Sequence, residues 1–435
     1  MKGENNIIMD KSIEMIYNYI KNNEKPADEL KLGAEFEHIL LDKDANTLGY
    51  FDRGGTGDLF REMEALGWEA NREGENILSI SKGNIYISTE PGGQLEFSTI
   101  PLKSIDEIKE ALKEFYLDAT MVLKDYDSNI YNIGFQPKTN VDDIKILPKE
   151  RYYAMYDYFK TSGKMGKYMM KGTASLQLSI DYTNEKDYGK KYSMANRLSN
   201  ILYMIFDNAP FFKDRPYEGY ALRSKIWNNT DRARTGMIER AFRLDFGYED
   251  YAKYLAENDA IYILKDGEFK RFNGKIKDAI DQNTSKEELE HLMTMVFPDV
   301  RTKKFIEIRQ IDSIPYPYNL GAIAFLKNLF YNEDNLEQAW NLLGDMSYKE
   351  AERARIEMYE KGFKTKIMGK SIDRLAGELL SMIDIDKSDE KYIKPIYDLF
   401  EGKSLKNLAI ESWENYAMVQ NAISDLRVRM EVFDV

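Results

Sequence analysis

The sequence lacks cysteine altogether and has only two histidines, His38 and His291, among its 435 residues. Without cysteine the chain can form no disulfide, no thiolate metal site, no cysteine nucleophile and no internal thiol switch. Two histidines also argue against a metal site built from several imidazoles. Acid–base and metal chemistry must therefore come from carboxylates, lysine, arginine and tyrosine.

Long apolar runs are also missing, since no segment approaches the roughly 20 apolar residues that cross a bilayer. Residues 1–23 are mixed and charged, unlike a signal or transit peptide. We therefore expect a cytoplasmic protein without a membrane partner. A net charge of −13 disfavours nucleic acid as the main partner, because such binding depends on clustered lysine and arginine.

Four segments predict strands in which every second residue is polar, and they comprise residues 33–37, 94–98, 173–181 and 305–309. Residues i and i+2 of a strand share a face, so Glu35 and Glu37 point the same way. Glu307 and Arg309 share a face for the same reason. The alternate positions, such as Phe36, are apolar. If these strands belong to one sheet, its back is core and its front gathers carboxylates.

Such a concentration of carboxylates points to a cation. Like charges that are held together raise each other's pKa and destabilise the fold unless a cation joins them. Hard divalent cations prefer oxygen ligands, and magnesium commonly brings a nucleotide phosphate with it. A solvated face of an antiparallel sheet would explain a single Glu-x-Glu pair equally well. Because the same arrangement occurs on four strands, a bound cation explains it better than a solvated face does.

The remaining patterns predict an α+β protein rather than a doubly wound sheet. A Ser-x-x-Glu capping box at Ser104 begins a helix over 104–125, and a second box begins at Ser285. Residues 78–99 read as a β-meander, and residues 211–236 as a loop dense in arginine, aspartate and aromatics. A short strand is expected over 131–135. Beyond Pro317 every strong signal is helical.

Several motifs resemble the glutamate–cysteine ligase family, in its plant and proteobacterial branch. They occur in collinear order between about residues 30 and 330, and are Gly33-x-Glu35-x-Glu37, Glu90-Pro91-Gly92-Gly93-Gln94-x-Glu96, Pro148-Lys149-x-Arg151-Tyr152, Thr173-x-Ser175-x-Gln177, Leu222-Arg223-Ser224-x-Ile226-Trp227, Phe297-Pro298-x-Val300-Arg301 and Glu307-x-Arg309.

The resemblance implies a catalytic core similar to glutamine synthetase over residues 1–330, in which a curved, mainly antiparallel sheet forms a funnel flanked by helices. A mostly helical region, residues 331–435, would pack on this core. The implied reaction joins the γ-carboxylate of L-glutamate to the amine of L-cysteine through a γ-glutamyl phosphate. Its products are γ-glutamylcysteine, ADP and phosphate, in the first step of glutathione biosynthesis. ATP and Mg²⁺ would be required, and the protein would be a monomer or a homodimer.

The resemblance also implies a set of metal ligands. The candidates are Glu35, Glu37, Glu90, Glu96 and Glu307. Gln177 is a possible polar ligand or orienting group in the nucleotide site. Glu90 could instead brace the turn at residues 91–93.

Arginines are the candidates for binding anionic groups, because their forked donors match carboxylates and phosphates. By their positions in the motifs, Arg151 and Arg223 would clamp the α-carboxylate of glutamate. Thr173 and Trp227 would line the same pocket. Arg309 would meet the transferred phosphoryl group, so that Arg223, Glu307 and Arg309 form the expected catalytic group.

Two further matched arginines, Arg234 and Arg301, could bind phosphate in the nucleotide site or tether loops. Ala174 stands where plant members carry a cysteine, so thiol control at that position cannot operate here. The acceptor pocket is the least defined part, and a γ-glutamyl ligase with another amine acceptor remains an alternative. A non-catalytic nucleotide-binding regulator on the same fold would be expected to lack the carboxylates.

Overall fold

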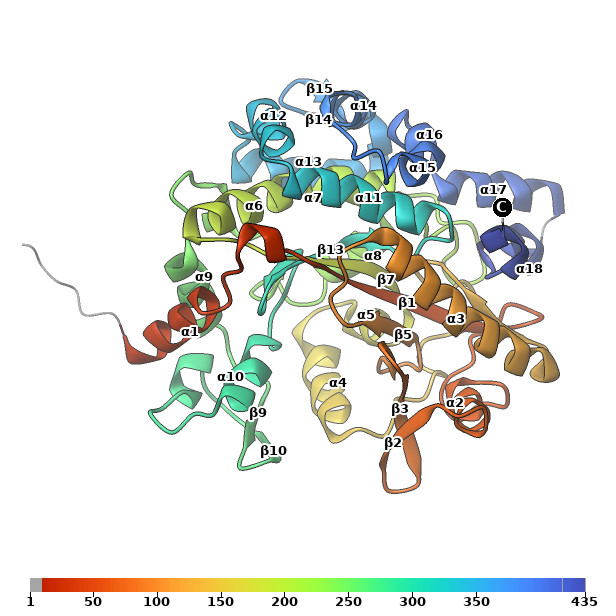
Figure 1. The fold of residues 1–435 in the computed structure, drawn as a ribbon. Helices are drawn as coiled ribbons and strands as arrows, with labels where there is room; N and C mark the ends of the chain where they lie inside the picture. Colours follow the sequence, from red (N-terminus) through yellow and green to blue (C-terminus); the bar gives the residue numbers. More distant parts are fainter. Residues whose placement is uncertain (1–9, 417, 435) are drawn as a thin grey trace, which may run out of the picture.

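A nine-stranded sheet forms the centre of the computed structural model, which describes residues 10–416 and 418–434 (Figure 1). Eight strands follow the order β12-β13-β7-β1-β5-β4-β3-β2, and β6 pairs with β1. Every pairing within this sheet is antiparallel. Its strands are β1 (Leu32–Asp42), β2 (Glu69–Glu73), β3 (Asn76–Lys82), β4 (Ile85–Thr89), β5 (Leu95–Thr99), β6 (Ser128–Tyr131), β7 (Ser175–Ile180), β12 (Val300–Thr302) and β13 (Ile306–Asp312). Residues 1–9, where the sequence predicts no targeting peptide, lie outside the described residues.

The four strands with polar faces are neighbours in this sheet, in the order β13, β7, β1, β5. Glu37 lies opposite Glu96, and Glu35 lies opposite Gln177. The alternate side chains point into the hydrophobic core, where Phe36 and its neighbours are buried. This register confirms that one face is core and that the other gathers the carboxylates.

Helices cover the apolar face of the sheet, and Figure 1 shows them as a layer on one side. Contacts to the sheet come from α3, α6, α7 and α11. The helices of the chain are α1 (Lys11–Lys21), α2 (Thr56–Ala65), α3 (Ile105–Leu123), α4 (Glu150–Ser162), α5 (Gly166–Gly172), α6 (Glu185–Arg197), α7 (Ser199–Ile205), α8 (Leu222–Asn228), α9 (Tyr248–Ala256), α10 (Lys286–Met293), α11 (Tyr318–Tyr331), α12 (Glu333–Leu343), α13 (Tyr348–Lys361), α14 (Ile372–Met382), α15 (Glu390–Ile393), α16 (Tyr397–Phe400), α17 (Leu405–Tyr416) and α18 (Val419–Ala422). The α+β architecture predicted from the sequence is confirmed.

The helices α12 to α18 follow the predicted boundary at residue 330 and pack on the rest of the molecule. One hydrophobic cluster extends from Ile16 to Phe433 and includes residues on both sides of that boundary. The division into 1–330 and 331–435 stays a prediction. No helix within residues 10–416 and 418–434 combines the length and the apolar composition that a membrane span needs.

Both predicted capping boxes are confirmed, since the side chains of Ser104 and Ser285 accept hydrogen bonds from the backbone N–H groups of Glu107 and Glu288. The strand predicted over residues 131–135 lies earlier in the chain, where β6 spans Ser128–Tyr131. A separate hairpin is formed by β9 (Tyr262–Lys265) and β10 (Glu268–Arg271).

One prediction of local structure was wrong. The expected loop at 211–236 contains α8, whose N-terminal neighbour Ala221 has a φ of 48° and provides no side-chain cap. The buried Asp207 carboxylate accepts a hydrogen bond from Ala221 N instead, so a tertiary contact supports this helix. The helical C-terminal third contains a hairpin of β14 (Lys366–Ile367) and β15 (Lys370–Ser371). Two-residue strands are too short to show alternation in a sequence. Two further short pairing strands, β8 (Thr235–Gly236) and β11 (Phe297–Pro298), lie outside the main sheet.

Candidate active site

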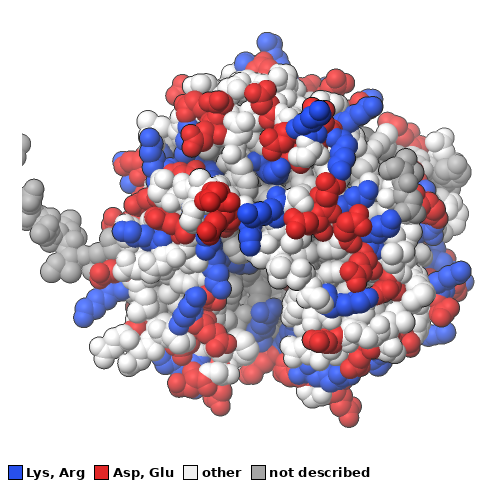
Figure 2. All heavy atoms as spheres, in the orientation of Figure 1, with Lys and Arg blue, Asp and Glu red and all other residues white. Residues whose placement is uncertain are grey.

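A cavity of about 230 Å³ opens on the polar face of the sheet. Figure 2 shows that this side of the molecule is hollowed below its centre and that lysine and arginine side chains surround the hollow. The predicted site residues that line the cavity are Glu35, Glu37, Glu90, Glu96, Arg151, Thr173, Gln177, Arg223, Trp227, Arg301 and Arg309. Segments that are far apart in the sequence therefore converge on one site. A larger groove of about 810 Å³ lies between α1 and residues 277–289 and contains none of these residues.

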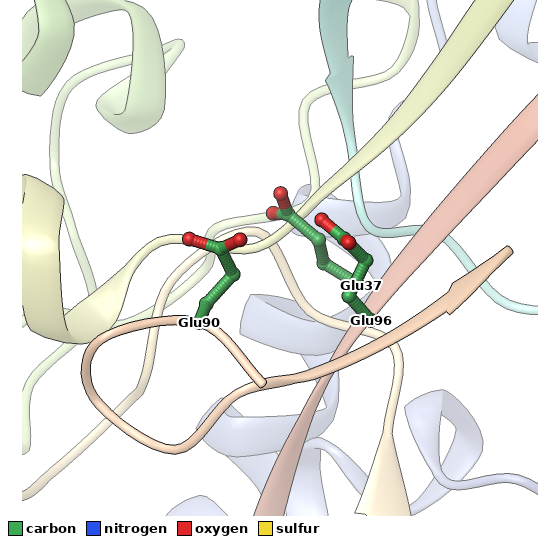
Figure 3. Close-up of side chains that lie close together, drawn as sticks. All are labelled: Glu37, Glu90 and Glu96. Atoms are coloured by element: carbon green, nitrogen blue, oxygen red, sulfur yellow. The ribbon is translucent and has the colours of Figure 1, made fainter. Parts of the chain in front are cut away.

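Three carboxylates form a cluster at one end of the cavity. Oxygen atoms of Glu37, Glu90 and Glu96 all lie within 4.8 Å of one another. Figure 3 shows the three side chains converging from β1, from the turn after β4 and from β5. Gln94 stabilises this turn, because its Oε1 accepts a hydrogen bond of 2.9 Å from Gly92 N. The Glu90 carboxylate thus belongs to the cluster. The side chain that braces the turn at residues 91–93 is that of Gln94.

Burial and mutual repulsion make these carboxyl groups weak acids. Burial, with the charge of Glu96, raises the pKa of Glu37 to about 7. Burial, with the charge of Glu90, raises the pKa of Glu96 to about 7. Burial also raises the pKa of Glu35 to about 7, although the charge of Lys303 opposes this rise. The pKa of Glu90 is raised by the same two causes, burial and the charge of Glu37. The cluster therefore carries negative charge that protein cations only partly compensate.

Gln177 connects the carboxylate cluster to the arginine side of the cavity. Its Nε2 donates a hydrogen bond of 2.9 Å to Glu37 Oε1, and its Oε1 accepts one from Arg309 Nη1. Ser175 donates to the other oxygen of Glu37 from its backbone N–H and its hydroxyl, at 2.7 and 2.9 Å. These contacts give Gln177 the geometry of an orienting group.

Glu307 is the one predicted metal ligand that does not line the cavity. It is fully buried and lies beneath the wall. Its Oε2 accepts hydrogen bonds of 2.7 Å from Arg301 Nε and 2.8 Å from Arg309 Nη1. The Nζ of Lys303 lies 2.7 Å from its Oε1. These three cations hold the pKa of Glu307 well below its usual range despite its burial. Its role as a metal ligand stays a prediction.

Arg223, on α8, is buried in the cavity wall and is bound to β13. Its Nη2 donates to the carbonyl of Arg309 at 2.6 Å, and its Nη1 donates to that of Gln310 at 3.2 Å. Trp227, one helical turn further, stacks on Phe297 with ring centroids 5.9 Å apart. Its Nε1 is buried and has no hydrogen-bond partner within the described residues. An unpartnered donor in a cavity wall is suited to a polar ligand.

Arg151 begins α4 on the opposite wall. Its Nη2 donates a hydrogen bond of 3.0 Å to the hydroxyl of Tyr152, and its guanidinium lies over that ring. Burial, with the charge of Arg151, lowers the pKa of Lys149 to about 8. Both cations thus lie near the carboxylate cluster without an ion pair to it among the described contacts, and their location suits an anionic ligand.

Arg234 and Arg301, which the sequence assigns either to phosphate binding or to loop tethering, have different contacts in the structure. Arg234 is 1% exposed and donates to Asp231, to Tyr158 and to two backbone carbonyls. It therefore tethers the loop. Arg301 lines the cavity while it pairs with Glu307.

Sequence reasoning missed several lining residues, namely Tyr152, Met155, Met169, Met170, Tyr262, Thr294 and Lys303. The apolar residues of this set lie on helices or on short strands, where nothing in the sequence separates a lining position from a core position. Lys303 lies in the turn after β12, where strand alternation no longer predicts the direction of a side chain.

The fold and the cavity together define a class of site, in which an antiparallel sheet presents carboxylates for a hard cation beside arginines for anionic groups. The family model described as glutamate-cysteine ligase family 2 (GCS2) matches residues 31–391, and the chain belongs to this family.

Individual relatives agree with that assignment. The chain is 29% identical over 374 residues to the chloroplastic glutamate–cysteine ligase of Arabidopsis thaliana, covering 84% of this chain and 71% of the relative. It is 29% identical over the same length to the chloroplastic glutamate–cysteine ligase A of Oryza sativa subsp. indica, covering 84% of this chain and 76% of the relative.

Two solved structures share the fold. A glutamate–cysteine ligase from Francisella tularensis, in complex with AMP, superposes with a TM-score of 0.56 and 15% identity, over 93% of this chain and 89% of that chain. A bifunctional glutathione synthetase from Pasteurella multocida has a TM-score of 0.53 and 14% identity, over 97% of this chain and 52% of that chain.

Proposed function

We propose that this protein joins the γ-carboxylate of L-glutamate to the amine of L-cysteine with consumption of ATP, giving γ-glutamylcysteine, ADP and phosphate. This is the first step of glutathione biosynthesis. The observation that carries the proposal is the meeting of the Glu37, Glu90 and Glu96 carboxylates with four arginines in one cavity. The family relationship supports the identity of the substrates. A cytoplasmic location and a monomeric or dimeric state stay predictions.

The chemistry accounts for both kinds of residue in the cavity. An oxygen of the γ-carboxylate attacks the terminal phosphorus of ATP, and ADP leaves. The amine nitrogen then attacks the acyl carbon, phosphate leaves, and the nitrogen loses a proton. Phosphoryl transfer needs positioning and charge neutralisation more than covalent help. Arg309 would stabilise the transferred group, and Arg223 and Arg151 would hold the carboxylate of glutamate.

The carboxylate cluster fits Mg²⁺. Its oxygen atoms lie within 4.8 Å of one another, and all of its donors are the oxygen ligands that this ion prefers. Burial and mutual repulsion raise the pKa values of Glu37 and Glu96, and a bound cation would favour their ionised forms. Glu37, Glu90 and Glu96 would hold the ion, with Glu35 beside them. When bound, Mg²⁺ neutralises the charge of the nucleotide phosphates.

A substrate panel tests the proposal. Purified protein is incubated with ATP, Mg²⁺ and L-glutamate, and ADP release is measured with L-cysteine and with a series of other amines. We expect L-cysteine to give the highest kcat/KM, with γ-glutamylcysteine identified by mass spectrometry. A clear preference for a different amine would identify that amine, and not L-cysteine, as the acceptor substrate. ADP release that never depends on L-glutamate would overturn the proposal.

The Glu96→Gln variant provides a matched loss of function. It removes one charge from the cluster and keeps the side-chain shape. We expect ADP release to fall at least 100-fold, a loss typical of removing a group that stabilises the transition state. The exposed Glu110 on α3 supplies the control, because Glu110→Gln lies away from the cavity and should leave turnover unchanged.

A further inference from the structure

Lys303 is the single lysine among the described residues that line the cavity. It lies in the turn between β12 and β13, and its backbone N–H donates a hydrogen bond of 2.9 Å to the carbonyl of Phe305. Its side chain is 25% exposed and reaches inward, so that Nζ lies 2.7 Å from Glu307 Oε1. Glu307 Oε1 nevertheless accepts no hydrogen bond with acceptable geometry among the described residues. The contact is therefore an ion pair that hydrogen bonding does not lock.

The three arginines that lie on or against β13 are held more firmly. Arg301 and Arg309 both donate hydrogen bonds to Glu307 Oε2, and Arg309 also donates to Gln177. Arg223 donates to two backbone carbonyls of β13. Lys303 has a flexible four-carbon stem and a compact charge. It is the cation best able to change partners.

The charge of Lys303 also reaches carboxylates on two other strands. It counteracts the rise that burial causes in the pKa of Glu35 on β1 and of Glu96 on β5. Lys303 thus acts as a counter-ion to three strands of the acidic face. A divalent cation on that face would have the same electrostatic role, and the two cations would repel each other.

We propose that Lys303 is a resident counter-ion of the acidic face, which leaves Glu307 when a divalent cation binds and then binds an anionic oxygen of the nucleotide triphosphate. The inference rests on the proposed function, because it assigns Lys303 to the same metal and nucleotide site. In the empty site the charge of Lys303 would weaken the binding of the metal. In the loaded site the same charge would strengthen the binding of the nucleotide. A residue with a merely structural role would not affect the two ligands in opposite directions.

The first experiment measures metal binding without nucleotide. Mn²⁺ is titrated into the protein and its affinity is followed by electron paramagnetic resonance. Lys303→Met removes the competing charge, so we expect the Kd for Mn²⁺ to fall about tenfold. Lys303→Arg keeps the charge and should stay within about threefold of the wild type. Lys304→Met is the surface control, because Lys304 is 46% exposed and pairs with Glu290, and it should leave the Kd unchanged.

The second experiment measures nucleotide binding. The Kd of a non-hydrolysable ATP analogue is determined by calorimetry at saturating Mg²⁺. We expect Lys303→Met to raise this Kd about tenfold or more, since a charge-assisted contact to a phosphate oxygen is lost. Lys303→Arg should restore most of the affinity. Circular dichroism and thermal melting of each variant establish that the fold is retained, and Lys303→Gln serves as a second neutral variant if the Met variant misfolds.

The outcomes separate the two levels of inference. Tighter Mn²⁺ binding together with weaker binding of the analogue supports the proposal. A Kd for Mn²⁺ that is unchanged or raised in both neutral variants overturns the counter-ion role, and an unchanged Kd for the analogue overturns the contact to the nucleotide. If the wild-type protein binds neither Mn²⁺ nor the analogue, the proposed function fails instead.

Discussion

The carboxyl groups of Glu35, Glu37 and Glu96 couple the stability of the protein to pH. Their pKa values are raised to about 7 by burial in the folded chain, and an unfolded glutamate has a pKa near 4.3. Between these values the folded state binds more protons than the unfolded state. Stability therefore falls as pH rises through this window. Asp312, whose pKa burial also raises to about 7, contributes in the same direction.

Divalent metal should weaken this dependence for the cluster. We expect the Tm of the protein in EDTA to fall between pH 5 and about pH 7.5. With saturating Mg²⁺ the decline should be much smaller, because metal binding favours the ionised carboxylates and increases with pH. Differential scanning calorimetry across this range, with and without Mg²⁺, measures both slopes. Identical slopes in EDTA and Mg²⁺ would show that the cluster does not bind the ion.

Arg223 gives a prediction about substrate affinity. A lysine in its place offers a single point charge, whereas the guanidinium fork can hold a carboxylate through two donors. We expect Arg223→Lys to raise the KM for L-glutamate about tenfold or more, with a smaller effect on the KM for ATP. Steady-state kinetics with each substrate varied in turn gives the comparison. Arg232→Lys is the control, because Arg232 is exposed and pairs with Glu352. A glutamate KM that does not change in Arg223→Lys contradicts the assignment.

At the scale of elements, the turn between β4 and β5 positions two of the three clustered carboxylates. Glu90 precedes this turn and Glu96 follows it. A Cβ on Gly92 would lie 2.7 Å from Lys171 Cα and 2.7 Å from its carbonyl oxygen. The turn is therefore in close contact with α5, and only glycine permits the approach.

We accordingly expect Gly92→Ala to displace Glu90. The substitution should lower the free energy of unfolding by about 1–3 kcal/mol through overpacking, and should raise the Kd for Mg²⁺ about tenfold. Gly83→Ala, in the other turn of the same meander, is the control. Gly83 has a φ of 57° with open space around it, so alanine there costs about 1 kcal/mol of strain and leaves the metal affinity intact. Equal metal affinities in the two variants would count against the role of the turn.

The same elements show how far sequence can lead. Strand alternation predicts which side chains share a face, because it depends only on local backbone geometry. Alternation therefore predicted that Glu35 and Glu37 share a face and that Glu307 and Arg309 share a face, whereas the roles of these residues came from the family resemblance. The order of strands, and the meeting of Lys303 with Glu307 across a hairpin, depend on tertiary register. Neither α8 nor the lining tyrosines of α4 and β9 have a local signal that separates them from ordinary packing.

On the scale of the whole molecule, a buried ion pair joins the C-terminal helices to the site. Arg355 on α13 is 1% exposed and donates from its Nη2 to the carboxylate of Asp299. Asp299 lies just before β12, and its carbonyl accepts a hydrogen bond of 3.0 Å from Arg309 N. Tyr203 on α7 donates to the same carboxylate at 3.1 Å. The backbone of Arg309 is thus connected to a helix beyond the predicted boundary at residue 330.

Removing one partner of this pair leaves the other charge buried and uncompensated. We expect Arg355→Met to lower the free energy of unfolding by about 3–5 kcal/mol, measured by urea denaturation. Arg353→Met on the same helix is the control, since Arg353 is 46% exposed and pairs with Glu357, and its effect should stay within about 0.5 kcal/mol. The double variant Arg355→Met with Asp299→Leu should be more stable than Arg355→Met alone, because no buried charge is then left unpaired. If Arg355→Met has the same free energy of unfolding as the wild type, the ion pair does not stabilise the contact between the C-terminal helices and the site.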